Sequence, residues 1–450
     1  MSKARNQMEP QQRKEFERLA REVIASFVKG IVSIDEALPT FFNDNGMTLF
    51  EGYAVRYTDE YLSARREFTK FAASKLKAKY THEKTIHKLC TDAGQDYVKL
   101  VANADKDNPQ GREEAAMALI DSVLAEGLRK YVHIEPNFLV RHAAPDTLTL
   151  GRVRSMRTEF ANRTTPLSKH KKIVLTLGNY PEQLFKNGVA TIGMPTSIWL
   201  VDVSATKENV IEEAKWLIDI AISLMRLCSN QWQGNFPSIG KVEPHPTYPT
   251  DMSKPHITME GQNAHTGALE LPGWYEITSE IAAAFDDPIV KSRAALLFDP
   301  SDRSLAQRVA QGLGWMSRGR QASDRSERLL YFFTAFEALF TSNDKNDPVT
   351  QTISRFVSVI YTQNIATRVA VYDHIKGLYA LRSSTIHEGR REVMWNDVNA
   401  LQVYSEAIFW IVLNRCDLSM TQETFTASLR DASHGLPWKF AASKNEIGTE

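Results

Sequence analysis

The sequence of 450 residues has little cysteine, no net charge and no long apolar run. Its three cysteines, Cys90, Cys228 and Cys416, lie too far apart for a CxxC metal site, and this scarcity is typical of a reducing cytoplasm. No apolar stretch approaches the roughly 20 residues that span a bilayer, and no secretory signal is recognisable at the N-terminus. We therefore expect a cytoplasmic protein with no membrane partner.

Motifs for phosphate binding, nucleophilic catalysis and metal binding are also missing. The chain contains neither a GxxxxGKS or GxxxxGKT loop nor the GxSxG of hydrolases. No cluster of His, Cys and Asp has metal-ligand spacing, and His82 and His87 are interpreted as surface residues. The sequence thus predicts no metal and no cofactor. Because 54 basic residues balance 54 acidic ones, any nucleic-acid surface must come from local patches.

The composition is that of a globular protein, with 43% apolar and 24% charged residues, and the length suits two domains or three. Residues 1–275 are predicted to form an N-terminal region, helical over 1–130 and α/β over 131–275. Apolar residues at helical spacing predict helices over 10–30, 60–80, 112–130 and 207–228. Runs of β-branched and aromatic residues predict strands over 173–177 and 198–203 and near Ile257.

From residue 276 onward the apolar spacing is helical throughout. Helices are expected over 276–285, 302–316 (capped by Ser301), 325–341, 349–362, 366–385 and 397–416. Asp324, followed three residues later by Glu327, predicts the start of the helix 325–341. Residues 276–420 are therefore expected to form a helical domain, and the polar residues 421–450 a tail. The predicted fold class is mostly α: an α/β-containing N-terminal part followed by an all-helical bundle.

A carboxylate interrupts the apolar stripe of the predicted helix 325–341. Glu337 lies about 40° from Phe333 around the helix, and an unpartnered buried charge costs several kcal/mol. On the helix 366–385, Tyr379 and Arg382 share an inward-facing stripe, so Arg382 is the natural partner of Glu337. Taken alone, these residues are explained by a structural ion pair.

His387 follows Arg382 by five residues, which is about 140° around an ideal helix. The two side chains therefore do not share a face, and they can converge in two ways. Either the helix ends between them, at the poor helix formers Ser383-Ser384-Thr385, or a second copy of the domain brings another pair across a twofold axis. Gly389, just beyond, suits the end of the helix.

Three segments of this region, in this order, resemble the HEPN superfamily and, within it, the Apea-like HEPN group. They are residues 328–340, 353–357 and 376–387. The upstream ALE element of the group appears as Ala335-Phe336-Glu337, and its second element as Leu378-Tyr379, ahead of Arg382. The resemblance covers residues 277–420.

The mark of the superfamily is an arginine, four to six residues and then a histidine near the end of a helix. Arg382 and His387 match this pattern, with the small polar Ser383 directly after the arginine. One departure is Glu388, which separates His387 from Gly389 where the group usually has His-Gly. This departure changes the local turn and the charge beside His387.

The resemblance implies an all-helical domain that forms a homodimer and acts as a metal-independent endoribonuclease. Arg382 and His387 would be the catalytic residues, supported by Glu337, Tyr379 and Ser383. Such chemistry uses the RNA 2′-hydroxyl as nucleophile, a histidine to accept its proton and a guanidinium to bind the phosphoryl oxygens. In a dimer, one histidine can act as base and the other as acid.

The resemblance also implies a biological setting. The superfamily is common in bacterial antiphage and abortive-infection systems, so a conditional toxin is expected, with a phage-derived or cellular trigger bound by residues 1–275. Two alternatives remain open. One is a non-catalytic HEPN module for dimerisation or nucleic-acid binding, and the other is the toxin of a toxin–antitoxin pair.

RNA as a partner requires positive charge outside the Arg382–His387 motif. The candidate basic residues are Lys376, Arg152, Arg154, Lys169, Lys171 and Lys172. Residues 152–172 carry six more basic than acidic side chains, and phosphate contacts are largely electrostatic. A solvated basic face is the competing interpretation of this stretch.

Overall fold

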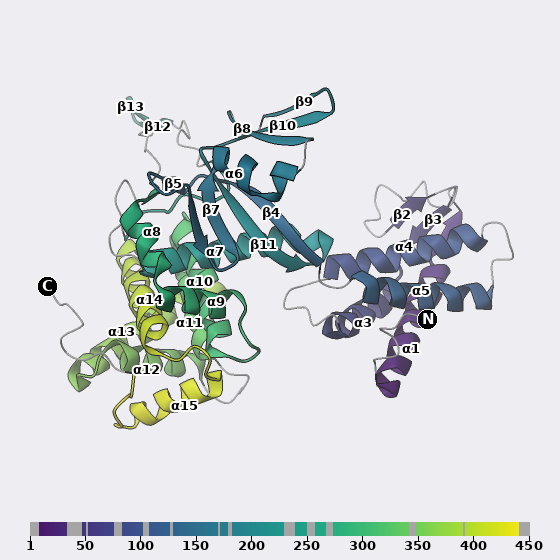
Figure 1. Ribbon diagram of the computed structural model, residues 1–450. Coiled ribbons are helices and arrows are strands. Elements are labelled where there is room, and N and C mark those ends of the chain that lie inside the picture. Colours follow the sequence, from purple (N-terminus) through teal and green to yellow (C-terminus); the bar gives the residue numbers. More distant parts are fainter. Residues whose placement is uncertain are drawn as a thin grey trace. The chain divides into compact units, whose positions relative to one another are not determined.

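The computed structural model describes most of the chain. The described residues are 9–33, 47–50, 53–75, 83–101, 108–126, 129–169, 172–178, 182–228, 239–249, 257–266, 273–341, 348–389 and 392–440. They are mostly helical, which confirms the predicted fold class (Figure 1). Across these ranges, every helix is too short or too polar to span a bilayer. The chain forms two compact units, residues 1–131 with 203–213, and residues 132–202 with 214–450.

The first unit is a set of helices with a small antiparallel sheet. Its elements are α1 (Pro10–Lys29), α3 (Asp59–Lys75), α4 (Glu83–Val101), α5 (Pro109–Glu126), β1 (Ile31–Ser33), β2 (Met47–Phe50), β3 (Tyr53–Arg56) and η3 (Lys207–Asn209). The sheet order is β1-β3-β2. The apolar stripe predicted for residues 10–30 is buried in α1, where Phe16 stacks on Phe68 of α3 with ring centroids 5.3 Å apart. The helix predicted over 112–130 ends at Glu126, and a strand begins at Arg129.

The second unit begins with β structure. Its largest sheet has the order β4-β11-β7-β6, made of β4 (Arg129–Asn137), β6 (Thr147–Leu150), β7 (Val153–Arg157) and β11 (Ser197–Ala205). A second sheet has the order β8-β10-β9, made of β8 (Ile173–Leu177), β9 (Gln183–Lys186) and β10 (Val189–Met194). The predicted strand 173–177 is β8, and 198–203 lies within β11. β11 is an inner strand of its sheet, and five successive side chains, from Ser197 to Val201, are buried.

Further elements lie between these sheets and the helical bundle in the sequence or beside the sheets. They are β5 (Val140–His142), α6 (Thr158–Thr164), η2 (Pro166–Lys169), α7 (Val210–Cys228), β12 (Ile257–Glu260), β13 (Asn263–Thr266) and β14 (Tyr275–Ile277). The predicted helix 207–228 is largely α7, and the strand near Ile257 is β12. β14 pairs in parallel with β5, so residues 276–277, expected to open the first helix of the bundle, are strand instead.

The helical bundle follows, drawn in green to yellow in Figure 1. Its helices are α8 (Ser279–Asp286), α9 (Pro288–Phe298), α10 (Leu305–Gln321), α11 (Arg325–Phe340), α12 (Val349–Tyr361), α13 (Ile365–Glu388), α14 (Trp395–Arg415) and α15 (Gln422–Ser433). Asp324 caps α11 as predicted, because its carboxylate accepts from the amides of Ser326 and Glu327. Ser304, rather than the expected Ser301, caps α10.

Two findings correct the predicted boundaries. Residues 421–450 are not simply a tail, because α15 is part of the bundle core. Phe425 of α15 is fully buried and stacks on Phe340, with ring centroids 6.4 Å apart. In addition, residues 132–202 and 214–275 belong to the same compact unit as the bundle, so residue 276 does not open a separate unit.

A buried ion pair joins the α/β part of this unit to the bundle. Arg320 of α10 donates from Nε to Glu243, in the loop after α7, over 2.9 Å, and from Nη2 to Ser223 of α7 over 2.8 Å. The side chains of Arg320 and Glu243 are 2% and 1% exposed. The same two residues are also joined through the backbone, because the Glu243 amide donates to the Arg320 carbonyl. The segments that meet here are separated by 77 positions in the chain.

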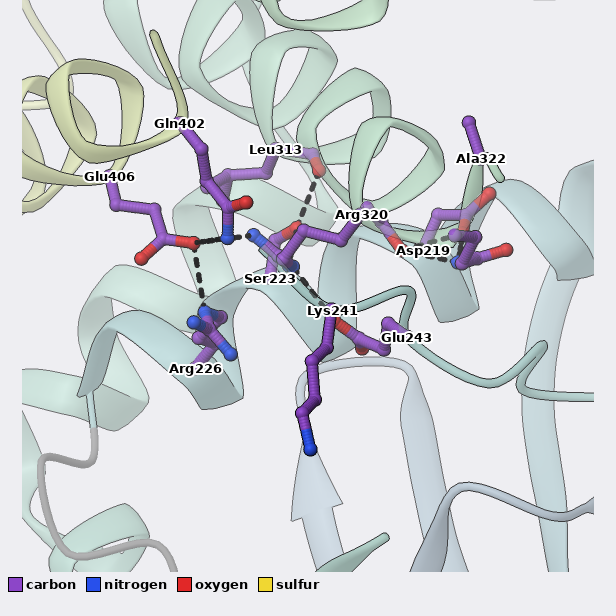
Figure 2. Close-up of polar contacts among 12 residues, drawn as sticks. Asp219, Ser223, Arg226, Lys241, Glu243, Leu313, Arg320, Ala322, Gln402 and Glu406 are labelled. Carbon is purple, nitrogen blue, oxygen red and sulfur yellow. Dashed lines mark hydrogen bonds and ion pairs between the residues drawn. The ribbon is translucent and has the colours of Figure 1, made fainter. Parts of the chain in front are cut away.

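Further polar contacts extend this network to α14 (Figure 2). Glu406 accepts from Arg226 of α7 and from Gln402 of its own helix, each over 2.9 Å. Gln402 in turn accepts from Arg328 of α11, whose side chain is fully buried. Because each buried charge or amide has a partner on another element, α7, α10, α11 and α14 are held in one arrangement.

The ion pair leads to a stability prediction. Glu243→Ala should lower the free energy of unfolding by about 3–5 kcal/mol, because Arg320 would stay buried without its carboxylate. The matched control is Asp286→Ala, which breaks the exposed pair with Lys291 and should cost about 1 kcal/mol or less. Urea unfolding followed by circular dichroism measures both. Equal losses in the two variants would contradict this role for Glu243.

Candidate functional site

Glu337 of α11 receives two donors from α13. Arg382 lies with Nη2 at 3.0 Å from Oε1 and 3.4 Å from Oε2 of Glu337. Tyr379, one turn earlier, donates its hydroxyl to Oε1 over 2.9 Å. The side chains of Arg382 and Glu337 are 21% and 23% exposed, so the cluster lies at the edge of the core rather than inside it. The predicted pairing of Glu337 with Arg382 is confirmed.

Packing fixes the orientation of this cluster. The Tyr379 ring meets Phe333 edge to face at 5.0 Å, and the Arg382 guanidinium lies 5.2 Å from the Tyr379 ring centroid. Burial, with the charge and hydrogen bond of Glu337, raises the pKa of Tyr379 to about 12. The hydroxyl is therefore protonated at neutral pH and remains a donor to Glu337.

The Arg382 guanidinium keeps unused donors. Its Nε is buried and does not face a ligand. Among the described residues the guanidinium bonds to Glu337 through Nη2, which leaves Nη1 as a donor. Arginine carries five N–H donors in a rigid fork that suits phosphate oxygens. A guanidinium held by one carboxylate and one ring can thus still bind an anion.

His387 stands apart from Arg382. Helix α13 continues to Glu388 and ends at Gly389, whose φ of 67° is the left-handed value typical of a helix end. The alternative in which the helix ends between Arg382 and His387 is therefore wrong. The hydroxyls of Ser384 and Thr385 bond to the Leu381 carbonyl, so these residues are accommodated within the helix.

The exposed face of α13 carries His387 and one other predicted residue. Counting 100° per residue, Lys376 and Ala380 lie within about 40° of His387, and all three are exposed. Ser383, half-buried, lies about 40° from His387 on the same side. Arg382 points about 140° away from His387 and about 7.5 Å back along the axis. Within one copy, the two predicted catalytic groups thus face different surroundings.

The remaining candidate basic residues do not join this site. Arg152 pairs with Asp299 at 3.1 Å, and Arg154 of β7 pairs with Asp202 at 3.2 Å. Lys169 and Lys172 are exposed just before β8, which Figure 1 shows at the opposite end of this unit from α13. Lys171 lies outside the described residues. The arginines are thus committed to carboxylates, and the lysines belong to a separate surface.

The structure also shows groups that the sequence did not reveal. Besides the Arg320 network, a pocket of about 450 Å³ opens between α7, α10, α11 and the loop 245–248. Its residues come from separate segments without a shared motif, so local spacing gave no signal. Within the described ranges, no group of three or more His, Cys, Asp or Glu is arranged to hold a metal ion.

Comparisons of the chain with protein-family models, with curated proteins and with solved structures give no match. The family resemblance therefore rests on the three sequence segments, which lie in α11, α12 and α13.

The Glu337 cluster yields a prediction that does not depend on function. Tyr379→Phe and Glu337→Ala should show a coupling energy of about 1 kcal/mol in a double-mutant cycle, because each removes one partner of the same hydrogen bond. Urea unfolding of the two single variants and the double variant gives this energy. Tyr372→Phe on the same helix is the control partner, and its effect should add to that of Glu337→Ala. Additivity in the Tyr379 cycle would contradict the shared bond.

Proposed function

We propose that the helical bundle is a metal-independent endoribonuclease of the HEPN type. The observation that carries the proposal is the Arg382 guanidinium, held by Glu337 beside the Tyr379 ring, on the helix whose last turn carries the exposed His387. Each group has the chemistry that RNA cleavage needs. The order of the three segments supports the same family.

The proposed reaction is an internal transesterification. His387 accepts the proton of a 2′-hydroxyl, whose oxygen forms a bond to the adjacent phosphorus while the bond from phosphorus to the 5′-oxygen breaks. The leaving 5′-oxygen takes a proton from a second acid, the His387 of another copy. Arg382 stabilises the negative charge that builds on the phosphoryl oxygens. The products are a 2′,3′-cyclic phosphate and a 5′-hydroxyl.

A homodimer completes this site. Arg382 and His387 of one copy point in different directions, so an arginine from one protomer and a histidine from its partner are the simpler combination. The exposed face near the end of α13 offers short side chains, Ala380 and Ser383, beside His387. Short side chains permit close approach of a second helix. Lys376, on the same face, would contact the RNA backbone.

The biological role follows from the family resemblance and not from the geometry. We propose a conditional toxin of antiphage, abortive-infection defence that acts in the cytoplasm on cellular or viral RNA. Residues 1–275 would bind the trigger. The toxin of a toxin–antitoxin pair would use the same nuclease but be silenced by a partner protein, which would co-purify with it.

A non-catalytic HEPN module is the second candidate. The ion pair of Arg382 with Glu337 is what a purely structural role also requires. Overexpression separates the two functions: an active nuclease slows growth, whereas an Arg382→Ala copy does not. Equal growth of cells with either copy would favour the dimerisation or nucleic-acid-binding module.

The cleavage prediction is specific to RNA. In EDTA, the purified protein should cut labelled RNA and leave 2′,3′-cyclic phosphate or 3′-phosphate ends. Arg382→Ala and His387→Ala should each lower the rate by about 10²–10⁴-fold. Glu337→Gln should lower it only in part, because Tyr379 and packing still position Arg382.

The control variant for this assay is His374→Ala, which removes an exposed histidine of the same helix that contacts Tyr404, and it should keep full activity. RNA with methylated 2′-hydroxyls should resist cleavage. Cutting of methylated RNA or DNA, or activity only with added Mg²⁺, would rule out this mechanism. A loss in Glu337→Gln as complete as in His387→Ala would contradict the positioning role of Glu337.

The dimer prediction concerns the end of α13. Sedimentation at micromolar concentration should show a dimer, and Ala380→Glu should give an inactive monomer because it places a charge on the close-packed face. Ile289→Glu, at an exposed position of α9, should leave both properties unchanged. A strict monomer with intact nuclease activity would overturn the two-copy site.

A further inference from the structure

The polar pocket between α7, α10, α11 and the loop 245–248 lies in the same unit as the Arg382 cluster but is lined by other residues. Its walls come from α7, α10, the first turns of α11 and the loop 245–248, and its volume of about 450 Å³ falls within the roughly 300–1,000 Å³ of small-ligand sites. Two cations, Lys215 of α7 and Arg318 of α10, line it. Neither belongs to the site proposed for RNA cleavage.

Aromatic rings hold Arg318 in place. Its guanidinium lies 4.8 Å from the ring centroid of Trp216 and 5.2 Å from that of Trp315. The Trp216 ring itself packs directly on Gly314, because a Cβ at position 314 would come within 2.5 Å of this ring. The guanidinium thus lies close to two indole rings, which restrict its position, and Arg318 lines the pocket.

The buried carboxylate of the pocket, Asp219, already accepts hydrogen bonds from three side chains of the protein. Asp219 is buried and accepts from Ser317 over 2.8 Å, from Gln321 over 3.0 Å and from Nε of Arg318 over 3.3 Å. Among the described residues, the Arg318 guanidinium donates to Asp219, and it does so through Nε. The terminal nitrogens of Arg318 therefore have donors for an incoming anion. The other carboxylate of the pocket, Glu327, is exposed at the rim.

Lys215 provides the second cation. Its ammonium lies 4.5 Å from the ring centroid of Tyr248 and contacts the Tyr248 hydroxyl. His245 packs on the other part of this loop, with its ring 4.6 Å from that of Tyr248. Burial and the charge of Lys215 lower the pKa of His245. Its Nδ1 accepts from the Thr247 amide, so Nε2 carries the proton and is a donor.

Flat apolar surfaces complete the pocket. Tyr248 and Tyr331 both line it, and Tyr331 stacks on Trp315 with centroids 5.8 Å apart and planes 18° apart. Bases stack on aromatic side chains in nucleic-acid sites because every base has a flat π face. The pocket thus combines two cations for an anion with aromatic faces for a planar ring.

We propose that this pocket binds a nucleoside phosphate, with the phosphate on Arg318 and Lys215 and the base against Tyr248 or Tyr331. The inference stands apart from the cleavage site and holds whether or not the protein cuts RNA. A ligand here contacts α7, α10 and α11 at once. Because these helices also share the buried Arg320 network, binding stabilises the folded unit by mass action.

Calorimetry and thermal unfolding of the full chain test the proposal. The probes are AMP, GMP, CMP and UMP, with adenosine and inorganic phosphate as the separated halves of the ligand. At least one nucleotide should bind tenfold or more tightly than either half and should raise the Tm. Lys215→Met and Arg318→Gln should each weaken that binding by roughly tenfold or more, the loss expected for a charge-assisted hydrogen bond.

Two further variants keep the test decisive. Tyr248→Ala removes an exposed ring without touching the core and should also weaken binding, which covers the case in which Arg318→Gln fails to fold. Lys291→Met, a distant exposed cation of α9, should bind as the wild type does. A dinucleotide with a 5′-phosphate distinguishes the source of the ligand. Binding as tight as that of the mononucleotide, and equally dependent on Lys215, identifies an RNA end, whereas weaker binding identifies a free nucleotide.

Three results would overturn the proposal. The first is the absence of binding by all four nucleotides at millimolar concentration. The second is inorganic phosphate binding as tightly as the nucleotides, which would remove the role of the base. The third is unchanged nucleotide affinity in both Lys215→Met and Tyr248→Ala, which would place the ligand elsewhere.

Discussion

The buried pair of Arg320 with Glu243 is the constraint on which the second unit depends. A guanidinium of this kind cannot stay in the core without a carboxylate, so the loop after α7 must lie on α10 whenever the bundle is formed. Ser223, Arg226, Gln402 and Glu406 extend the same requirement to α7 and α14. The α/β segments and the helices therefore act as one body rather than as two domains joined by a linker.

This constraint explains where sequence-based prediction succeeded and where it failed. The capped start of α11 and the pairing of Glu337 with Arg382 could be predicted, because helical spacing and the cost of a buried charge are local arguments. The partition at residue 276 could not, because a pair separated by 77 positions leaves no trace in local periodicity. The core position of α15 was missed for a related reason. Its apolar residues, such as Phe425, are few, and Phe425 packs on Phe340, which is distant in the sequence.

The candidate site was predictable in composition but not in arrangement. Helical spacing indicated the pairing of Glu337 with Arg382, and the family resemblance singled out His387 and Tyr379. Whether the helix ends between the arginine and the histidine was one of two open possibilities. The structure carries α13 on to Glu388, so the helix does not end between the two residues, and our proposal uses the other possibility, a second copy. Helix α11 contributes Glu337 to this site and Tyr331 to the nucleotide pocket. The two residues point about 120° apart around the helix, so each site has its own face.

The central claim is that an arginine of one copy and a histidine of another form one RNA-cleaving site. Co-expression of Arg382→Ala with His387→Ala, followed by purification of the mixed dimer, tests it most directly. The mixed dimer keeps one Arg382 and one His387 on different protomers, so RNA cleavage in EDTA should return in part, with water in place of the second histidine as the acid, although each variant alone is inactive. A mixed dimer as inactive as its parents would contradict the claim.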